Sequence, residues 1–238
     1  MARGKILCLH GSGTSAEVRH MFNFPKATAN AANQILRHQL YPLGQKLKED
    51  VGVEFVFAQA EVVTPPAIGV AEVYEGPYLS FFSWSDPPTS EDLDSVAAAY
   101  ELIYDMIEDE GPFEGILGFS QGATLACAFL LHHSQEHSYD LPFVHFRYAI
   151  FIAGLPPRTS NSEPLLPSPD RVVLLPTVHI SGTKDDAFPD SLRLSEMCKE
   201  DMKTMVIHDQ GHIIPRESQL LREVVKAVRD ARQIATAA

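Results

Sequence analysis

The sequence contains few cysteines and few basic residues. Its three cysteines, Cys8, Cys127 and Cys198, lie far apart and lack the CxxC spacing of zinc or redox sites. We expect three reduced thiols that pack as small hydrophobic side chains, with no metal site and no cofactor. Lys and Arg number 19 against 31 Asp and Glu, so the formal net charge is −12. Such a chain repels a phosphate backbone, and nucleic acid is not an expected partner.

Long hydrophobic runs are also absent. The first apolar run, Ile6–Leu9, is too short for the hydrophobic region of a signal peptide. No stretch approaches the roughly 18 consecutive apolar residues that a membrane helix needs. We therefore expect a cytoplasmic protein without a membrane as partner. Because 45% of the 238 residues are apolar, the chain can bury a full core, and we expect one domain spanning residues 1–238.

Short apolar runs rich in β-branched residues alternate with helical patterns. This alternation predicts an α/β fold with a mostly parallel central sheet flanked by helices. The runs are Ile6–Leu9, Val53–Ala58, Gly115–Phe119, Tyr148–Ala153, Thr177–Ser181 and Thr204–Ile207.

Helices are expected between and after these runs. One begins at Thr89–Asp92, which resembles a capping box, and ends at Gly111–Pro112. A last helix carries one apolar face between Leu220 and Val228. Residues Ala27 to Lys48 are mostly helical in pattern, but we expect Pro42 to break or kink that helix.

Two proline-rich segments, Glu61–Pro88 and Leu155–Pro176, fit neither the helical nor the strand period. Long ordered loops in a compact domain are usually functional. The first also contains many aromatic residues, so we expect it to lie over a pocket. The candidate substrate-binding residues are Tyr78, Phe81, Phe82 and Trp84.

The segment Gly118–Gly122, Gly-Phe-Ser-Gln-Gly, follows one predicted strand and precedes a good helix. A strand, a tight turn and a helix are the context of a nucleophile elbow, in which glycines permit close packing and the serine hydroxyl is exposed above the sheet. Ser120 is therefore the candidate nucleophile.

A serine hydroxyl needs a histidine to take its proton and an acid to hold that histidine. Asp185 and His212 each follow a predicted strand in the chain order Ser, Asp, His that α/β-hydrolases use. The adjacent Asp186 competes with Asp185, and His208 is an alternative base. We favour Asp185 because of its Gly-x-x-Asp spacing from Gly182.

The other histidines receive structural interpretations. His132, His133 and His137 lie on or just after the helix that follows Ser120, and we expect them to face solvent. His179 lies within a strand and is expected in the core.

A turn of small residues, His10–Ser15, follows the first strand. A tetrahedral oxyanion needs two backbone N–H donors, one from the residue after the nucleophile and one from such a turn. Gln121 and Ser12 are the candidates. The turn lacks the G-x-G-x-x-G pattern and the P-loop lysine, so a dinucleotide or phosphate loop is the disfavoured alternative.

Together, the turn at Leu7–Ser15, Gly76–Tyr78 with Phe81 and Phe82, and Gly118–Gly122 resemble the fungal serine hydrolase (FSH) family, and Asp185 and Gly211–His212 complete the match. The resemblance implies an α/β-hydrolase fold with loop inserts in place of a large cap domain, a Ser-Asp-His triad, and esterase or thioesterase activity. It is nearest to members encoded with polyketide pathways.

The function expected is hydrolysis of an acyl ester or thioester, releasing or trimming a polyketide-type acyl chain in fungal secondary metabolism. An acyl carrier protein domain of a polyketide synthase is then a partner, for which Lys26, Arg37, Lys46 and Lys48 are candidate docking residues. General small-molecule carboxylesterase and acyltransferase activities stay open, because one acyl-enzyme serves all of them. A ligand-binding receptor with this fold is the alternative that is not an enzyme.

Overall fold

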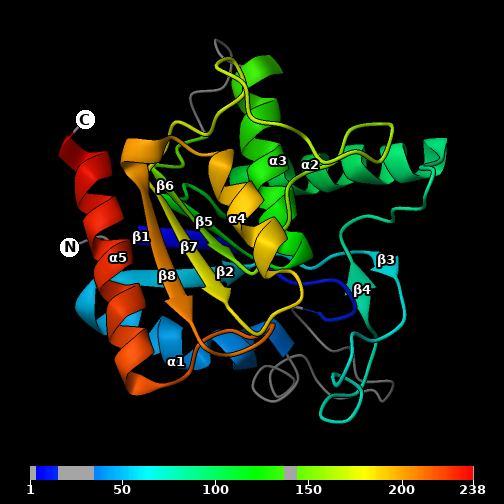
Figure 1. Cartoon of the computed structure of the whole chain (residues 1–238). Helices are drawn as coiled ribbons and strands as arrows, with labels where there is room; N and C mark the ends of the chain where they lie inside the picture. The colour runs from blue at the N-terminus through cyan, green and yellow to red at the C-terminus, as the bar shows by residue number, and fades with distance from the viewer. Residues whose placement is uncertain (1–3, 16–34, 137–143, 238) are drawn as a thin grey trace.

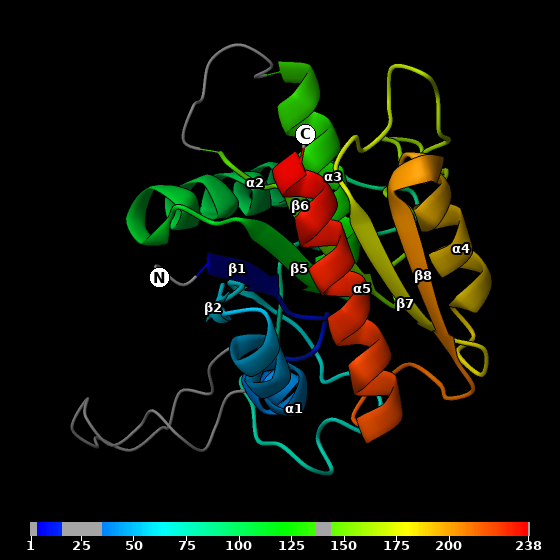
Figure 2. The same cartoon turned by 90° about the vertical axis from the view of Figure 1, so that its left-hand side faces the viewer.

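The computed structural model describes residues 4–15, 35–136 and 144–237. Its centre is a sheet of six parallel strands in the order β2-β1-β5-β6-β7-β8 (Figures 1 and 2). The strands are β1 (Gly4–Leu9), β2 (Val53–Phe57), β5 (Gly115–Phe119), β6 (Tyr148–Ile152), β7 (Thr177–Gly182) and β8 (Lys203–His208). All six lie within a residue or two of the predicted runs, and the mostly parallel sheet is confirmed.

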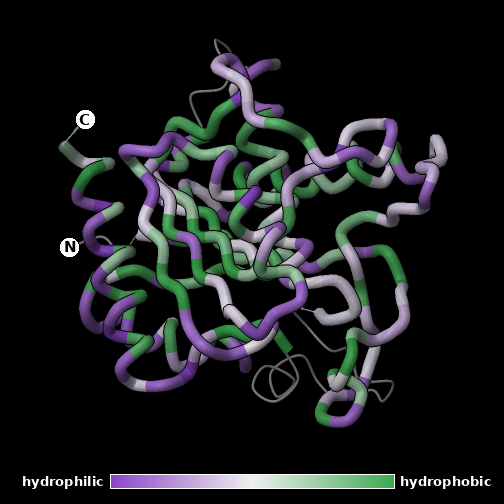
Figure 3. The backbone as a smooth tube through the Cα atoms, in the orientation of Figure 1, coloured by the Kyte–Doolittle hydropathy of each residue, from purple (hydrophilic) through white to green (hydrophobic). Residues whose placement is uncertain are grey.

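Helices cover both faces of this sheet. On one face lie α1 (Ile35–Asp50) and α5 (Ser218–Ala237). On the other lie α2 (Ser90–Glu110), α3 (Gln121–Glu136) and the short α4 (Phe188–Glu196). Side chains alternate between the faces: Ile6 of β1 packs with the first pair of helices and Leu7 with the second group. Figure 3 shows the hydrophobic residues concentrated along the central strands.

The helix predicted to break or kink at Pro42 continues through it. α1 runs unbroken from Ile35 to Asp50, while residues 27–34 lie outside the described part of the chain. Proline in a helix leaves the carbonyl four residues earlier without its usual donor. Here the Arg216 guanidinium donates to that carbonyl, on His38, at 3.3 Å. A residue far away in sequence thus donates the hydrogen bond that Pro42 cannot give to the His38 carbonyl.

The proline-rich segment 61–88 forms a small second sheet. β3 (Val62–Val63) and β4 (Leu79–Ser80) pair antiparallel, and Thr14, just after β1, forms an isolated bridge with Leu79. This insert therefore lies against the turn that follows the first strand. It ends at α2, where Thr89 and Asp92 form the predicted capping box.

Besides β3 and β4, two short helical elements were not predicted, α4 and a 3-10 turn at Glu200–Met202. Both lie between β7 and β8 and carry few apolar residues, so their hydrophobic pattern is weak. Among the described helices, none is both long and apolar enough to cross a membrane.

Candidate active site

Ser120 lies in a sharp turn between β5 and α3. Its φ is +54°, a left-handed conformation that is costly for a residue with a side chain, and its amide donates to Ile152 O at 2.8 Å. The flanking glycines permit this turn. A Cβ on Gly118 would lie 2.2 Å from Gly122 O, and one on Gly122 would lie 2.3 Å from Leu9 O. The turn therefore has the geometry of a nucleophile elbow.

His212 and Asp185 are hydrogen-bonded. The distance from His212 Nδ1 to Asp185 Oδ2 is 2.7 Å, and the other carboxylate oxygen accepts from the Ala187 amide at 2.9 Å. The Asp185 side chain is 5% exposed, whereas that of His212 is 39% exposed. The His212 ring also lies 5.1 Å from the ring of Phe119, the residue before Ser120. The structure thus places an imidazole, oriented by Asp185, against the residue that precedes Ser120.

The alternative acid, Asp186, and the alternative base, His208, have different surroundings from Asp185 and His212. Asp186 is exposed, and His208 is buried with its Nδ1 accepting from the Gln210 amide. Burial lowers the pKa of His208. The loops after β7 and β8 are paired by amides, Thr183 N to His208 O at 2.8 Å and Lys184 N to Gln210 O at 3.0 Å. This pairing sets the distance between the Asp185 and His212 loops.

The turn after β1 approaches the elbow from the other side. A Cβ on Gly11 would lie 3.3 Å from Ser120 Cβ, so Gly11 packs against the nucleophile elbow. Ser12 is the next residue in the chain. Gln121 is the first residue of α3, where backbone amides have no partner within the helix. Ser120, Asp185, His212 and Ser12 all follow the carboxyl ends of parallel strands, the edge at which α/β folds bind ligands.

His10 shapes this turn from inside the core. Its Nε2 accepts from the Ala60 amide at 3.2 Å, and its Nδ1 lies 2.8 Å from Gly11 O. Nδ1 therefore carries the proton and donates to the turn. Burial lowers the pKa of His10 to about 4, so the ring is neutral near pH 7.

A cavity of about 420 Å³ opens beside Ser120. Its walls come from the two proline-rich segments, from α2 and from the start of α3. Most of the lining is apolar or aromatic, which suits a hydrocarbon chain. The lining residues are Phe82, Trp84, Ser85, Asp86, Val96, Tyr100, Ser120, Gln121, Thr124, Leu125, Ala128, Leu155, Pro156, Pro157 and Arg158.

The sequence matches a family model described as "Serine hydrolase (FSH1)" over residues 1–224. Hydrolase phiM of Talaromyces stipitatus is 33% identical over 233 residues, covering 93% of this chain and 84% of the relative. Esterase FPY3 of Fusarium mangiferae is 32% identical over 220 residues, covering 89% and 88%. The chain belongs to the FSH1 serine hydrolase family.

Solved structures show the fold of this serine hydrolase. A carboxylesterase from Mesorhizobium loti superposes with a TM-score of 0.58 at 18% identity, covering 96% of this chain and 89% of that one. SOBER1 of Arabidopsis thaliana gives a TM-score of 0.52 at 19% identity, covering 97% and 100%. The α/β-hydrolase fold predicted from the sequence is confirmed, and family membership makes the protein a hydrolase.

The four aromatic residues expected at the pocket divide into two pairs. Phe82 and Trp84 line the cavity beside Ser120. Phe81 and Tyr78 do not. Phe81 is buried with its ring 4.6 Å from that of His10, and the Tyr78 hydroxyl donates to Tyr74 O at 2.6 Å. Phe81 and Phe82 are neighbours just after β4, yet only Phe82 lines the cavity.

The opposite wall of the cavity, residues 155–158, was not anticipated as part of the site of this serine hydrolase. The Thr124 hydroxyl donates to Leu155 O at 2.9 Å and fixes this wall to α3. Beyond residue 158, Trp84 Nε1 donates to Ser162 Oγ at 3.4 Å. This bond joins the two proline-rich segments beside the cavity. In the sequence, this wall was marked only by a proline-rich stretch that fits neither the helical nor the strand period.

A larger hollow of about 610 Å³ lies over α1 and β2, and none of the candidate catalytic residues lines it. Arg37 and Lys48 of the expected carrier-docking set do line it, whereas Lys46 does not and Lys26 lies outside the described residues. The Arg37 guanidinium lies over the Phe57 ring at 4.6 Å.

The helical histidines differ from expectation. His132 and His133 are half-buried, and they pack on Tyr100 and Tyr104 of α2. His137 lies outside the described residues. His179 is 1% exposed, which confirms its place in the core. Within the described ranges, no group of three His, Cys, Asp or Glu side chains could hold a metal ion.

Proposed function

We propose that this serine hydrolase cleaves acyl esters and thioesters through Ser120, His212 and Asp185. The observation that carries the proposal is the 2.7 Å bond from Asp185 to His212 Nδ1 beside the strained turn of Ser120. With Nδ1 bonded to the carboxylate, Nε2 is the nitrogen that can take the serine proton.

The reaction would proceed through an acyl-enzyme. Ser120 Oγ attacks the substrate carbonyl carbon while His212 Nε2 takes its proton, and backbone amides of Ser12 and Gln121 stabilise the oxyanion. The C–O or C–S bond then breaks, and His212 returns the proton to the leaving alcohol or thiol. Water attacks the acyl-enzyme with His212 again as base, which releases the carboxylic acid and restores Ser120.

The cavity beside Ser120 supports an apolar acyl group as substrate. Phe82 and Trp84 lie on one side and Leu155–Pro157 on the other, so a chain esterified to Ser120 would lie between them. Binding energy from such remote contacts acts on longer acyl chains and not on acetyl. A polyketide-type chain is the substrate that we propose.

A carrier-bound thioester is the finer form of the proposal. A thiolate leaves more readily than an alkoxide, and the same amide donors serve both. Long-range electrostatics oppose it, because carrier domains are usually acidic and this chain has a net charge of −12. Arg37 and Lys48, which share one hollow, are the proposed local docking contacts.

Single-turnover kinetics test the proposal with one octanoyl group presented in three ways: on a holo carrier protein, on a pantetheine analogue and as a p-nitrophenyl ester. We expect the carrier thioester to show the highest kcat/KM, and Arg37→Gln to reduce that advantage only. If the oxygen ester is cleaved best and the carrier gives no gain, the protein is a small-molecule esterase. Transfer of the octanoyl group to an added alcohol in preference to water would identify an acyltransferase.

Trp84→Ala provides the test of the cavity. We expect the variant to lower kcat/KM for octanoyl esters about tenfold or more and to leave acetyl esters within about twofold, because only the longer chain reaches the wall. Tyr78→Ala is the matched control in the same segment, since its hydroxyl bonds to Tyr74 O outside the cavity. Equal losses on both esters in Trp84→Ala would contradict an acyl-binding role.

A further inference from the structure

We infer that the side chain of Gln121 is a positioning group that holds the two proposed oxyanion donors at a fixed separation, acting through residues Leu79–Phe82. We call these four residues the bridging segment. This inference rests on the proposed function, because it assigns the Ser12 and Gln121 amides to the oxyanion. It adds a role for a side chain beyond the triad.

Both halves of the Gln121 amide are used on the bridging segment. Its Oε1 accepts from the Phe81 amide at 2.9 Å, and its Nε2 donates to Phe82 O at 2.8 Å. The side-chain amide thus pairs with a backbone donor and a backbone acceptor of two consecutive residues. Gln121 directly follows Ser120, so this pair of bonds ties the nucleophile turn to the bridging segment.

The other end of the bridging segment is tied to the turn after β1. The Gly13 amide donates to Leu79 O at 3.0 Å, and the Leu79 amide donates to Thr14 O at 2.7 Å. The hydroxyls of Ser12 and Ser80 are hydrogen-bonded, with 2.6 Å between their Oγ atoms. Ser12 itself therefore contacts the segment.

The core side of the segment reinforces the same connection. The Phe81 ring lies 4.6 Å from the ring of His10, which in turn donates to Gly11 O. Gly13 permits residues 65–67 of the insert to approach the turn closely: its φ is +68°, and a Cβ there would lie 2.3 Å from Ala67 N. The turn is thus closed in by the insert on one side and by His10 on the other.

These contacts form a continuous path from one proposed donor to the other. It runs from the Ser12 backbone through Ser80 and Phe81 to the Gln121 side chain and back to the Gln121 amide. Oxyanion donors act only when they lie about 3 Å from the developing charge, so small displacements lower turnover. Phe82, at the end of the segment, also lines the cavity.

The test uses Gln121→Met and Gln121→Glu, both of which retain the backbone amide, with p-nitrophenyl acetate as substrate. We expect Gln121→Met to lower kcat about 10- to 100-fold and to leave KM within about twofold, because losing a donor outright costs about 10²–10³. Gln135→Met is the matched control: Gln135 lies at the other end of α3, bonded to Asp170 O at 3.5 Å, and its variant should keep the wild-type kcat.

Gln121→Glu adds a readout that a merely structural role would not change. The introduced carboxylate can accept from the Phe81 amide but repels Phe82 O, whereas the protonated acid can donate to it. The ratio of wild-type kcat to variant kcat should therefore fall toward one as the pH is lowered through the titration of the introduced group. A ratio that does not change with pH would contradict the positioning role of Gln121.

The outcomes separate this inference from the proposed function. Wild-type kcat in Gln121→Met would overturn the inference while leaving the triad intact. If Gln121→Met does not fold, Gln121→Glu and Ser80→Ala decide. Losses in kcat at constant KM support the positioning role of Gln121, and wild-type kcat in both variants overturns it. Unchanged turnover in Ser120→Ala would instead overturn the proposed function.

Discussion

Asp185 and Asp186 are neighbours in the chain, but their carboxylates have different surroundings. Asp185 is buried, with one oxygen on His212 and the other on the Ala187 amide, while Asp186 is exposed. Asp185 follows Gly182, where a Cβ would lie 2.1 Å from Gln210 O. This close approach of the two loops brings His212 to the first carboxylate and not to the second.

Exchanging each carboxylate for an amide tests this assignment. Asp185→Asn should lower kcat on a p-nitrophenyl ester by about 10³–10⁴, because the amide favours the wrong imidazole tautomer. Asp186→Asn is the matched control and should stay within about twofold. Should Asp186→Asn show the larger loss, the acid has been assigned to the wrong residue.

Much of the site was accessible from the sequence at this scale. Ser120, Asp185 and His212 each follow a recognisable strand, so their order and local context predicted which loops would meet. The sequence could not predict which of the aromatic residues would line the cavity. Phe81 and Phe82 are adjacent, and only Phe82 lines the cavity; the segment that precedes them is placed by the pairing of Leu79 with Thr14, far away in sequence.

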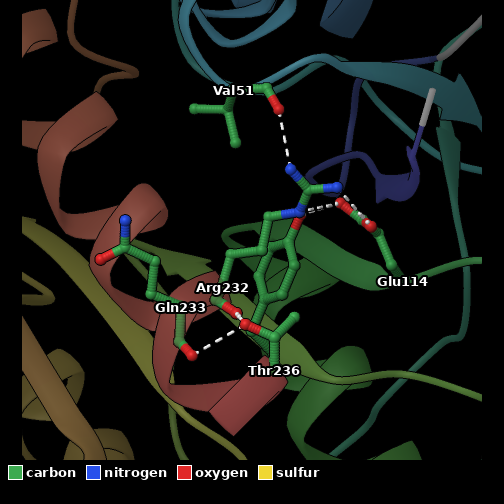
Figure 4. Close-up of polar contacts among 6 residues, drawn as sticks. Val51, Glu114, Arg232, Gln233 and Thr236 are labelled. Atoms are coloured by element: carbon green, nitrogen blue, oxygen red, sulfur yellow. Dashed lines mark hydrogen bonds and ion pairs between the residues drawn. The ribbon is translucent and has the colours of Figure 1, made fainter. Parts of the chain in front are cut away.

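At the scale of elements, α5 is joined to the sheet by a network around Arg232. Its guanidinium contacts both oxygens of Glu114 at 2.9 and 3.0 Å and donates to Val51 O at 2.8 Å (Figure 4). The Tyr148 hydroxyl donates to the same carboxylate at 3.1 Å. Glu114 precedes β5 and Ser120 follows it, so the network lies at the end of the strand away from the site.

Removing the guanidinium tests this network. Arg232→Met should lower the free energy of unfolding by about 1–2 kcal/mol, less than for a fully buried pair because the two side chains are 31% and 18% exposed. Urea denaturation measures the change, and kcat should not alter. Arg229→Met, which removes a surface pair with Asp50 at 3.9 Å, should cost less than about 0.5 kcal/mol. Equal losses in the two variants would contradict the account.

Element boundaries show where sequence patterns are insufficient. The strands were found because buried parallel strands are continuous apolar runs. Helix α1 was expected to break or kink at Pro42, but it runs unbroken, and Arg216 donates to the His38 carbonyl that the proline leaves without a donor. That donor lies just before α5, so no local pattern around Pro42 could reveal it.

At the scale of the whole molecule, two core histidines make the stability sensitive to acid. Burial lowers the pKa of His10 to about 4, and burial, with a smaller contribution from Lys203, lowers that of His179 to about 3. In the unfolded chain both would titrate near 6.5. The folded state thus binds fewer protons below pH 6.5, and stability present above that pH is lost as the pH falls toward 4.

Substitution of His179 tests this linkage. His179→Phe should make the free energy of unfolding less dependent on pH between 6.5 and 5, by up to about 1.4 kcal/mol per pH unit. Urea denaturation across this range measures the slope. His145→Phe, at an exposed position, should leave it unchanged. An unchanged slope in His179→Phe would show that His179 titrates alike in both states.

The central claim is that Ser120 forms a covalent acyl-enzyme, and intact-protein mass spectrometry after incubation with a fluorophosphonate tests it most directly. The account predicts one adduct on the wild-type protein, mapped by peptide sequencing to Ser120, and none on Ser120→Ala. Ester turnover in that variant should fall by several orders of magnitude, since only binding and the oxyanion donors would remain. An adduct on any other residue, or undiminished labelling of Ser120→Ala, would contradict the account.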